Sequence, residues 1–314
     1  MNSSVKNFTV NTIKGMGMGA ANVIPGVSGG TIALITGIFE RIINAIKSID
    51  IVAFRLLLKG KFKELIVHTD FYFLLAVFSG MVISILTLAR LFEFLFSHYP
   101  VYIWSFFFGL ILASIYFVGK TVSKWTVSVV ISFIVSAALA VWVSFLNPAA
   151  PNDSFVYLIL CGIVAICSMI LPGISGSFVL LLMGNYELVM IDAVNEINLK
   201  VLFPAGIGMV IGLIAFSHIL SWVYKKFRDH TISVLTGFIL GSLSIIWPWK
   251  NAIYRTDSLG EFVMKKGEKI VQGYKLYFPD SISSEVILAV VFVIAGIATI
   301  VLIEKLASKK QTTA

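Results

Sequence analysis

The sequence predicts an all-α polytopic membrane protein made of two inverted repeats, each a re-entrant helical hairpin followed by three transmembrane helices. Three observations support this fold class. The 314 residues are 58% hydrophobic and only 13% charged, with a mean hydropathy of +0.96, which exceeds the range of ordinary soluble domains. Apolar stretches of about 20 residues, long enough to cross a bilayer as helices, recur along the chain. A Pro-Gly-Val/Ile-Ser-Gly element occurs once in each half, at Pro25 and at Pro172.

Six of the apolar stretches are uninterrupted and predict full transmembrane helices. In the first predicted repeat, residues 1–150, they lie at 71–96, 100–118 and 126–146. In the second, residues 151–314, they lie at 201–223, 231–248 and 285–303.

Two further apolar regions, 12–46 and 155–193, are each interrupted by a Pro-Gly pair and small residues. Proline removes a backbone donor and clashes with the preceding turn, and glycine lacks the side chain that favours a helix. Each region is therefore predicted to form a re-entrant hairpin around an irregular loop. Unpaired backbone groups cannot face lipid, so both loops are expected inside the helix bundle.

The positions of Lys and Arg predict the topology. The connection 41–70 carries six of them, 97–99 none, 120–124 two and 147–154 none, so the positive-inside rule places 41–70 and both termini in the cytoplasm. The segment 249–284 is an exception, because it carries six on the predicted external side. Cationic loops also explain the net charge of +8, so no nucleic-acid partner is expected. No cleavable signal peptide is expected, and the predicted location is the cytoplasmic membrane.

The duplication extends beyond the Pro-Gly element. Aligning Pro25 with Pro172 pairs Gly37 with Gly184 and Glu40 with Glu187 without a gap, and the 80–83 and 109–114 segments match 208–211 and 237–242 at a second offset. A hairpin followed by three spans crosses the membrane an odd number of times, so the second copy is expected upside down. Inverted repeats with broken helices meeting near the midplane are typical of secondary transporters.

The two loops are the predicted binding site. Each precedes a half-helix whose first N–H groups lack partners and whose dipole contributes roughly half a positive charge, which attracts anions. A phosphate held between two such helix ends is the hypothesis, and the alternative is that the hydroxyl groups only cap the half-helices. The candidate phosphate-binding residues are Gly26, Ser28, Gly29, Gly30, Thr31, Gly173, Ser175, Gly176 and Ser177.

Four charged residues are candidates for coupling or gating: Glu40, Arg41, Glu187 and Arg90. Glu40 and Glu187 lie about 15 Å along the helix from each break, near the hydrocarbon boundary. They are candidate carriers of H⁺ or Na⁺, or a gate in which Glu40 pairs with Arg41, and the alternative is that they are interfacial charges that point to water. Arg90 and Glu93 lie three residues apart on one span, where they form a structural ion pair or a substrate clamp.

The segments NVIPGVSGGTIALITGIFERII and MILPGISGSFVLLLMGNYELV resemble the paired motifs of the bacterial and archaeal polyprenyl-phosphate transporter family. The resemblance covers residues 12–305, except for 249–284. It implies movement of undecaprenyl phosphate, or a related anionic lipid, from the outer to the cytoplasmic leaflet for reuse in envelope synthesis. The motif residues carried over are the glycines, hydroxyl residues and glutamates of the two loops, together with Pro25 and Pro172.

Other function classes fit parts of the pattern. A secondary transporter of a small anionic solute would use the same loops. The Gly-x-Ser-Gly pattern also occurs in serine hydrolases, and His218 could serve as a base in an intramembrane serine protease. However, a protease needs one activated serine and the motif is duplicated. The chain is therefore predicted not to be an enzyme, and no metal ion or organic cofactor is expected.

Overall fold

The computed structural model describes residues 3–23, 28–146, 148–173, 175–254, 264–265, 268–269 and 271–311. Its helices up to residue 150 are α1 (Ser3–Val23), α2 (Gly29–Ile35), α3 (Phe39–Lys47), α4 (Ile51–Leu58), α5 (Phe62–His68), α6 (Phe71–His98), α7 (Pro100–Gly119) and α8 (Val127–Ser144). Those that follow are α9 (Phe155–Ile170), α10 (Gly176–Leu182), the π-helix η1 (Glu187–Asp192), α11 (Ala193–Asn195), α12 (Leu199–Lys226), α13 (Arg228–Ser242) and α14 (Ser284–Gln311).

Within the described residues, five helices are long and apolar enough to cross a membrane, namely α6, α7, α8, α12 and α14, and the bent pair of α2 and α3 would make a sixth span. The five long helices confirm five of the six predicted spans to within a few residues. The sixth prediction, 231–248, was too long, because α13 has 15 residues and ends at Ser242. At 1.5 Å per residue α13 reaches about 22 Å, less than the roughly 30 Å of a bilayer core.

The first interrupted region folds back on itself. Lys14 Nζ on α1 donates a hydrogen bond to the carbonyl oxygen of Thr36 at 2.7 Å, so the end of α2 lies beside the middle of α1. Gly37 follows with a φ of +69°, a left-handed conformation that glycine adopts without strain, and α3 then leaves at 115° to α2. The region therefore contains a bent, re-entrant-like helix pair, with its bend at Gly37. The predicted break at Pro25 and Gly26 lies outside the described residues.

The second interrupted region repeats this geometry. Tyr157 Oη on α9 donates to the carbonyl oxygen of Met183 at 2.8 Å, and Gly184 follows with a φ of +75°. Met183 and Gly184 are the sequence equivalents of Thr36 and Gly37. The two hairpins therefore close at matching backbone positions, although a lysine makes the contact in one and a tyrosine in the other.

The hairpins pack on the long helices through glycines. A Cβ added at Gly15 would collide with the carbonyl oxygen of Val77 in α6, and one at Gly162 would collide with that of Ala205 in α12. Gly162 aligns with Gly15, and Ala205 aligns with Val77. The α1–α6 and α9–α12 pairs are therefore equivalent contacts in which the two backbones touch.

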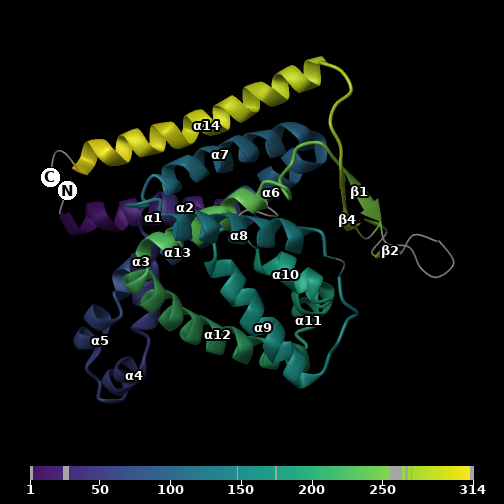
Figure 1. The fold of residues 1–314 in the computed structure, drawn as a ribbon. Helices are drawn as coiled ribbons and strands as arrows, with labels where there is room; N and C mark the ends of the chain where they lie inside the picture. The colour runs from purple at the N-terminus through teal and green to yellow at the C-terminus, as the bar shows by residue number, and fades with distance from the viewer. Residues whose placement is uncertain are drawn as a thin grey trace.

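The remaining long helices pack against helices of the other predicted repeat. The α8 helix packs against α13, and α7 packs against α14 (Figure 1). A Cβ at Gly237 would collide with the carbonyl oxygen of Phe133, and one at the aligned Gly109 would collide with that of Val293. The third span of each half thus packs on the second span of the other. Figure 1 also shows both chain ends at the same side of the molecule.

The chain is mostly helical, and the segment after α13, to which the sequence assigned no structure, contains short strands. Strand β1 (Lys250–Tyr254) pairs antiparallel with β4 (Val271–Leu276), and β2 (Met264–Lys265) pairs with β3 (Glu268–Lys269). Lys250 anchors β1 to α7: its Nζ donates to Ile245 O at 2.5 Å and lies 3.4 Å from the centre of the Trp104 ring. Burial lowers the pKa of Lys250 to about 7, while the ring contact favours its charged form.

Candidate functional site

The first loop caps its half-helix with two side chains. Ser28, the N-cap residue of α2, accepts a hydrogen bond from Gly30 N at 3.1 Å. Asn22, near the end of α1, accepts one from Gly29 N at 2.7 Å through Oδ1. Both N–H groups at the start of α2 are thus satisfied within the protein. Gly26, the fifth candidate in this loop, lies outside the described residues.

The same loop contacts the chain just before the second Pro-Gly element. Ser28 Oγ donates to the carbonyl oxygen of Met169 at 3.3 Å, and a Cβ added at Gly30 would lie 2.7 Å from Ile170 O. Ser28 is only 3% exposed. The fold therefore brings the first loop against the end of α9, which leads into the second loop.

Thr31, in the first turn of α2, carries a hydroxyl without a partner. Its side chain is 1% exposed, and Oγ1 makes no hydrogen bond with any described residue. Buried hydroxyl groups in proteins are nearly always paired with protein or water. Within the described structure this hydroxyl is unsatisfied, as are the buried hydroxyls of Ser84 and Ser105.

The second loop is built differently. Ser175, the N-cap of α10, makes no side-chain bond to the described helix start, and its hydroxyl instead lies 2.7 Å from Ser177 Oγ. The equivalent of Asn22 is Met169, whose side chain lies against Gly176. Gly173 has a φ of +85°, and a Cβ there would collide with the carbonyl oxygen of Phe238 in α13. The N-cap residues Ser28 and Ser175 thus share an extended backbone, but the two helix starts are satisfied differently.

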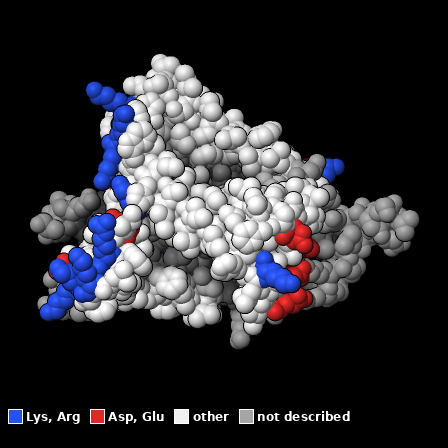
Figure 2. All heavy atoms as spheres, turned by 90° about the horizontal axis from the view of Figure 1, so that it is seen from below, with Lys and Arg blue, Asp and Glu red and all other residues white. Residues whose placement is uncertain are grey.

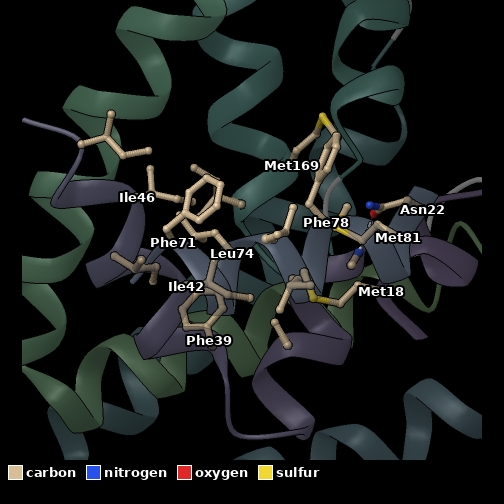
Figure 3. Close-up of a pocket in the computed structure, with 18 residues that line it drawn as sticks. Met18, Asn22, Phe39, Ile42, Ile46, Phe71, Leu74, Phe78, Met81 and Met169 are labelled. Atoms are coloured by element: carbon tan, nitrogen blue, oxygen red, sulfur yellow. Dashed lines mark hydrogen bonds between the residues drawn. The ribbon is translucent and has the colours of Figure 1, made fainter. Parts of the chain in front are cut away.

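A cavity of about 500 Å³ lies beside the first loop (Figure 3). Residues of α1, α2, α3, α6 and the end of α9 line it, and Asn22 is the one polar side chain among them. The amide of Asn22 was not among the sequence-predicted site residues. An asparagine inside an apolar stretch was the available signal, and it was missed because its counterpart in the second copy is a methionine.

The predicted gating residues lie apart from the loops. Arg41 forms a two-bond ion pair with Asp70 at 2.6 and 3.0 Å, and its guanidinium lies 4.1 Å from the centre of the Phe73 ring. Arg41 therefore pairs with Asp70 rather than with Glu40, which is exposed. Glu187 begins the π-helix η1. Arg90 lies in α6, but its side chain and that of Glu93 are outside the described residues.

The described structure contains no hydrogen-bonded pair of serine and His218 of the kind that a serine protease requires. The ring of His218 contacts the carbonyl oxygen of Ile214 on its own helix at 2.8 Å. Ser28 donates to Met169, and Ser175 lies against Ser177. Among the described residues, no hydrogen bond joins His218 to either serine, and a nucleophile without a base is not activated.

Comparisons with known proteins agree on one family. A family model described as undecaprenyl phosphate translocase-like matches residues 18–263. A polyprenyl-phosphate transporter of Vibrio cholerae serotype O1 is 39% identical over 310 residues, which are 98% of this chain and 100% of that protein. A polyprenyl-phosphate transporter of Staphylococcus aureus is 29% identical over 257 residues, which are 76% of this chain and 86% of that protein. No solved structure matches the chain.

Both relatives are named as transporters, which agrees with the prediction that the chain is not an enzyme. The family match includes both Pro-Gly elements and all the helices from the end of α1 to α13. The chain is a multi-pass membrane protein that belongs to the undecaprenyl phosphate translocase-like family.

Proposed function

We propose that this protein moves undecaprenyl phosphate, or a related anionic polyprenyl lipid, from the outer to the cytoplasmic leaflet of the cytoplasmic membrane. The observation that carries the proposal is the near full-length similarity to a polyprenyl-phosphate transporter. The lipid is then available again for cell-envelope synthesis. The phosphate headgroup cannot cross hydrocarbon unaided, whereas the tail can remain in lipid, so the protein has to supply a polar path for the headgroup alone.

The phosphate in this proposal is held by the two loops. The buried, unpaired hydroxyl of Thr31 supports a ligand at the first loop. There the N–H groups of Gly29 and Gly30 are bonded to Asn22 and Ser28, so a bound phosphate replaces internal hydrogen bonds with its own. In the second loop, the Ser175 and Ser177 hydroxyls bond to each other and can turn toward a phosphate. The remaining proposed ligands are Gly26, Gly173 and Gly176.

The proposed mechanism is alternating access between inverted repeats. Gly15 and Gly162 are aligned residues that make equivalent contacts with a neighbouring helix, and the same holds for Gly109 and Gly237. These matched contacts support two pseudo-equivalent halves. Figure 2 shows most Lys and Arg on the side of the molecule that carries α4 and α5, with a few acidic residues among them. A group of Asp and Glu, with a basic side chain beside it, lies on the opposite side. This segregation supports opposite membrane sides for the two hairpin ends, with both termini in the cytoplasm. Two such halves can exchange conformations and expose one site to each leaflet in turn.

Charged residues at the hairpin ends are the proposed gate. The Arg41–Asp70 ion pair joins the start of α3 to the start of α6, so its opening would free the first hairpin to move. Glu40 and Glu187, at equivalent positions, are the proposed sites at which H⁺ or Na⁺ acts. Arg90 is proposed to attract the headgroup along α6.

The test is leaflet movement in liposomes that contain the purified protein. The double variant Ser28→Ala, Ser175→Ala should slow the movement of undecaprenyl phosphate at least about tenfold, because each lost hydrogen bond to a charged group is worth about 1.5–3 kcal/mol. The control is Ser132→Ala, since the Ser132 hydroxyl bonds within α8 and is exposed. If the double variant moved undecaprenyl phosphate at the wild-type rate, the proposed role of the loop serines in transport would be contradicted.

The small-anion alternative is tested in the same liposomes. Inorganic phosphate trapped inside should stay inside, because the proposed path carries a headgroup that remains attached to a lipid-embedded tail. Release of trapped phosphate at a rate that the double serine variant abolishes would instead identify a solute transporter.

A further inference from the structure

The cavity beside the first loop has the chemistry of an amphiphile site. Of its eighteen lining residues, all but Asn22 have apolar side chains or are glycines. Figure 3 shows Asn22 at one end and Ile46 and Phe71 toward the other, with Leu74 and Phe78 between them. Its volume of about 500 Å³ falls within the roughly 300–1,000 Å³ of small-molecule sites. An apolar space with a single polar end fits neither a free inorganic ion nor a soluble polar metabolite.

The polar end is oriented toward a headgroup by its own hydrogen bond. Asn22 Oδ1 accepts from Gly29 N, and this bond determines which way the amide is turned. No described residue accepts a hydrogen bond from Asn22 Nδ2. Its two N–H groups are therefore available to an acceptor in the cavity, next to the loop that carries the unpaired Thr31 hydroxyl.

The side of the cavity formed by α6 opens away from the protein core. Phe78 is 65% exposed and Leu75 is 39% exposed, and both line the cavity on a helix that crosses the membrane. Exposed apolar side chains on such a helix face lipid. A ligand can therefore enter from the bilayer without its chain passing through water.

We infer that this cavity seats the first isoprenoid units of the substrate's polyprenyl chain, with the Asn22 amide at the headgroup end. The inference rests on the proposed function and adds to it a tail site on α3 and α6. A polyprenyl chain that moves from lipid to an apolar protein wall gains no hydrophobic free energy. The cavity therefore has to select its substrate by close packing against a single, branched chain. Ordinary two-chain phospholipids are the competitor that it has to exclude.

The experiment is photo-crosslinking in liposomes that contain wild-type protein. The probe is an undecaprenyl phosphate analogue with a diazirine in the isoprene units nearest the phosphate. It should label peptides of α3 and α6 that carry Ile42, Leu74 or Phe78, and excess unlabelled undecaprenyl phosphate should reduce this labelling at least about tenfold. Phosphatidylglycerol with a diazirine in its acyl chain is the control probe for ordinary lipid contact. Equal labelling of these peptides by that probe, or labelling that undecaprenyl phosphate does not reduce, would overturn the inference.

A variant pair tests the cavity itself. Leu74→Trp places a large ring inside it and should abolish the competed labelling, whereas Leu86→Trp adds the same ring to an α6 position that is 74% exposed and does not line the cavity. The wild-type labelling pattern keeps the inference testable if Leu74→Trp does not fold. Leaflet movement in the same wild-type liposomes separates the two proposals. Movement without competed labelling contradicts the tail site alone, and absence of movement contradicts the proposed function as well.

Discussion

At the scale of single residues, the two loops differ most where Asn22 aligns with Met169. The Asn22 amide satisfies the start of α2 and lines the cavity, while Met169 packs an apolar side chain on the start of α10 and accepts the Ser28 hydroxyl through its backbone. The two aligned loops thus differ in the chemistry at their helix starts. In the conformation described, the polar cap belongs to the first half.

Replacing Asn22 should separate capping from ligand contact. Asn22→Ala removes the bond to Gly29 N and should lower stability by about 0.5–2 kcal/mol, the usual cost of a lost cap. It should also slow the movement of undecaprenyl phosphate, because the donor at the head end of the cavity is lost. Thermal unfolding in detergent and leaflet movement in liposomes measure the two effects.

The matched control for this variant is Asn198→Ala, which removes the cap bond that Lys200 N donates to Asn198 Oδ1 at the start of α12. Both variants should lose similar stability, and only Asn22→Ala should lose transport. Equal transport in the two variants would assign Asn22 a purely structural role.

Residue identities predicted where the loops lie in the sequence better than they predicted which residues the loops contact. Proline and glycine disrupt a helix locally, so the sequence could predict the start of α2 at Gly29 and the end of α9 before Pro172. The Ser28–Met169 contact spans 141 residues and the Arg41–Asp70 pair spans 29, and both arise only from packing. For that reason the sequence pointed to Glu40 as the partner of Arg41, and the cavity beside Asn22 was not predicted.

At the scale of elements, the hairpins depend on close backbone contact. Both α1 and α9 present a glycine to the long helix beside them, and nothing larger fits. Hydropathy predicted the long helices well because length and apolar content decide them. It predicted α13 too long, because the apolar run continues through Ile245 and Ile246 after the helix ends at Ser242. It also missed β1–β4, whose strands are too short to leave a pattern.

Replacing single glycines by alanine should therefore separate the effect of close helix contact on stability from the effect of helix propensity. Gly162→Ala should destabilise the protein by about 1–3 kcal/mol, because the added methyl group collides with Ala205 O. Gly206→Ala is the control, since a Cβ there meets nothing within 4 Å and alanine favours the helix by about 0.5–1 kcal/mol. Thermal unfolding followed by size-exclusion chromatography measures both. A Gly162→Ala protein as stable as wild type would mean that α9 and α12 do not touch as described.

At the scale of the whole molecule, α8 packs on α13 and α7 packs on α14, so helices of the two predicted repeats pack against each other. Sequence did not predict this pairing, because a helix that is apolar on all sides does not indicate its partner. In this arrangement, the first loop lies against the end of α9, which leads into the second loop. The proposed headgroup path therefore runs through the centre of the protein, and the tail cavity opens beside it.

The most direct test of the account follows undecaprenyl phosphate placed in the outer leaflet of liposomes containing wild-type protein, with a membrane-impermeant phosphatase added outside. Movement inward protects the lipid from hydrolysis. The account predicts a protected fraction that grows with time in protein-containing liposomes, does not grow in protein-free liposomes, and grows more slowly with Ser28→Ala or Ser175→Ala alone. A protected fraction equal to that of protein-free liposomes would contradict the account.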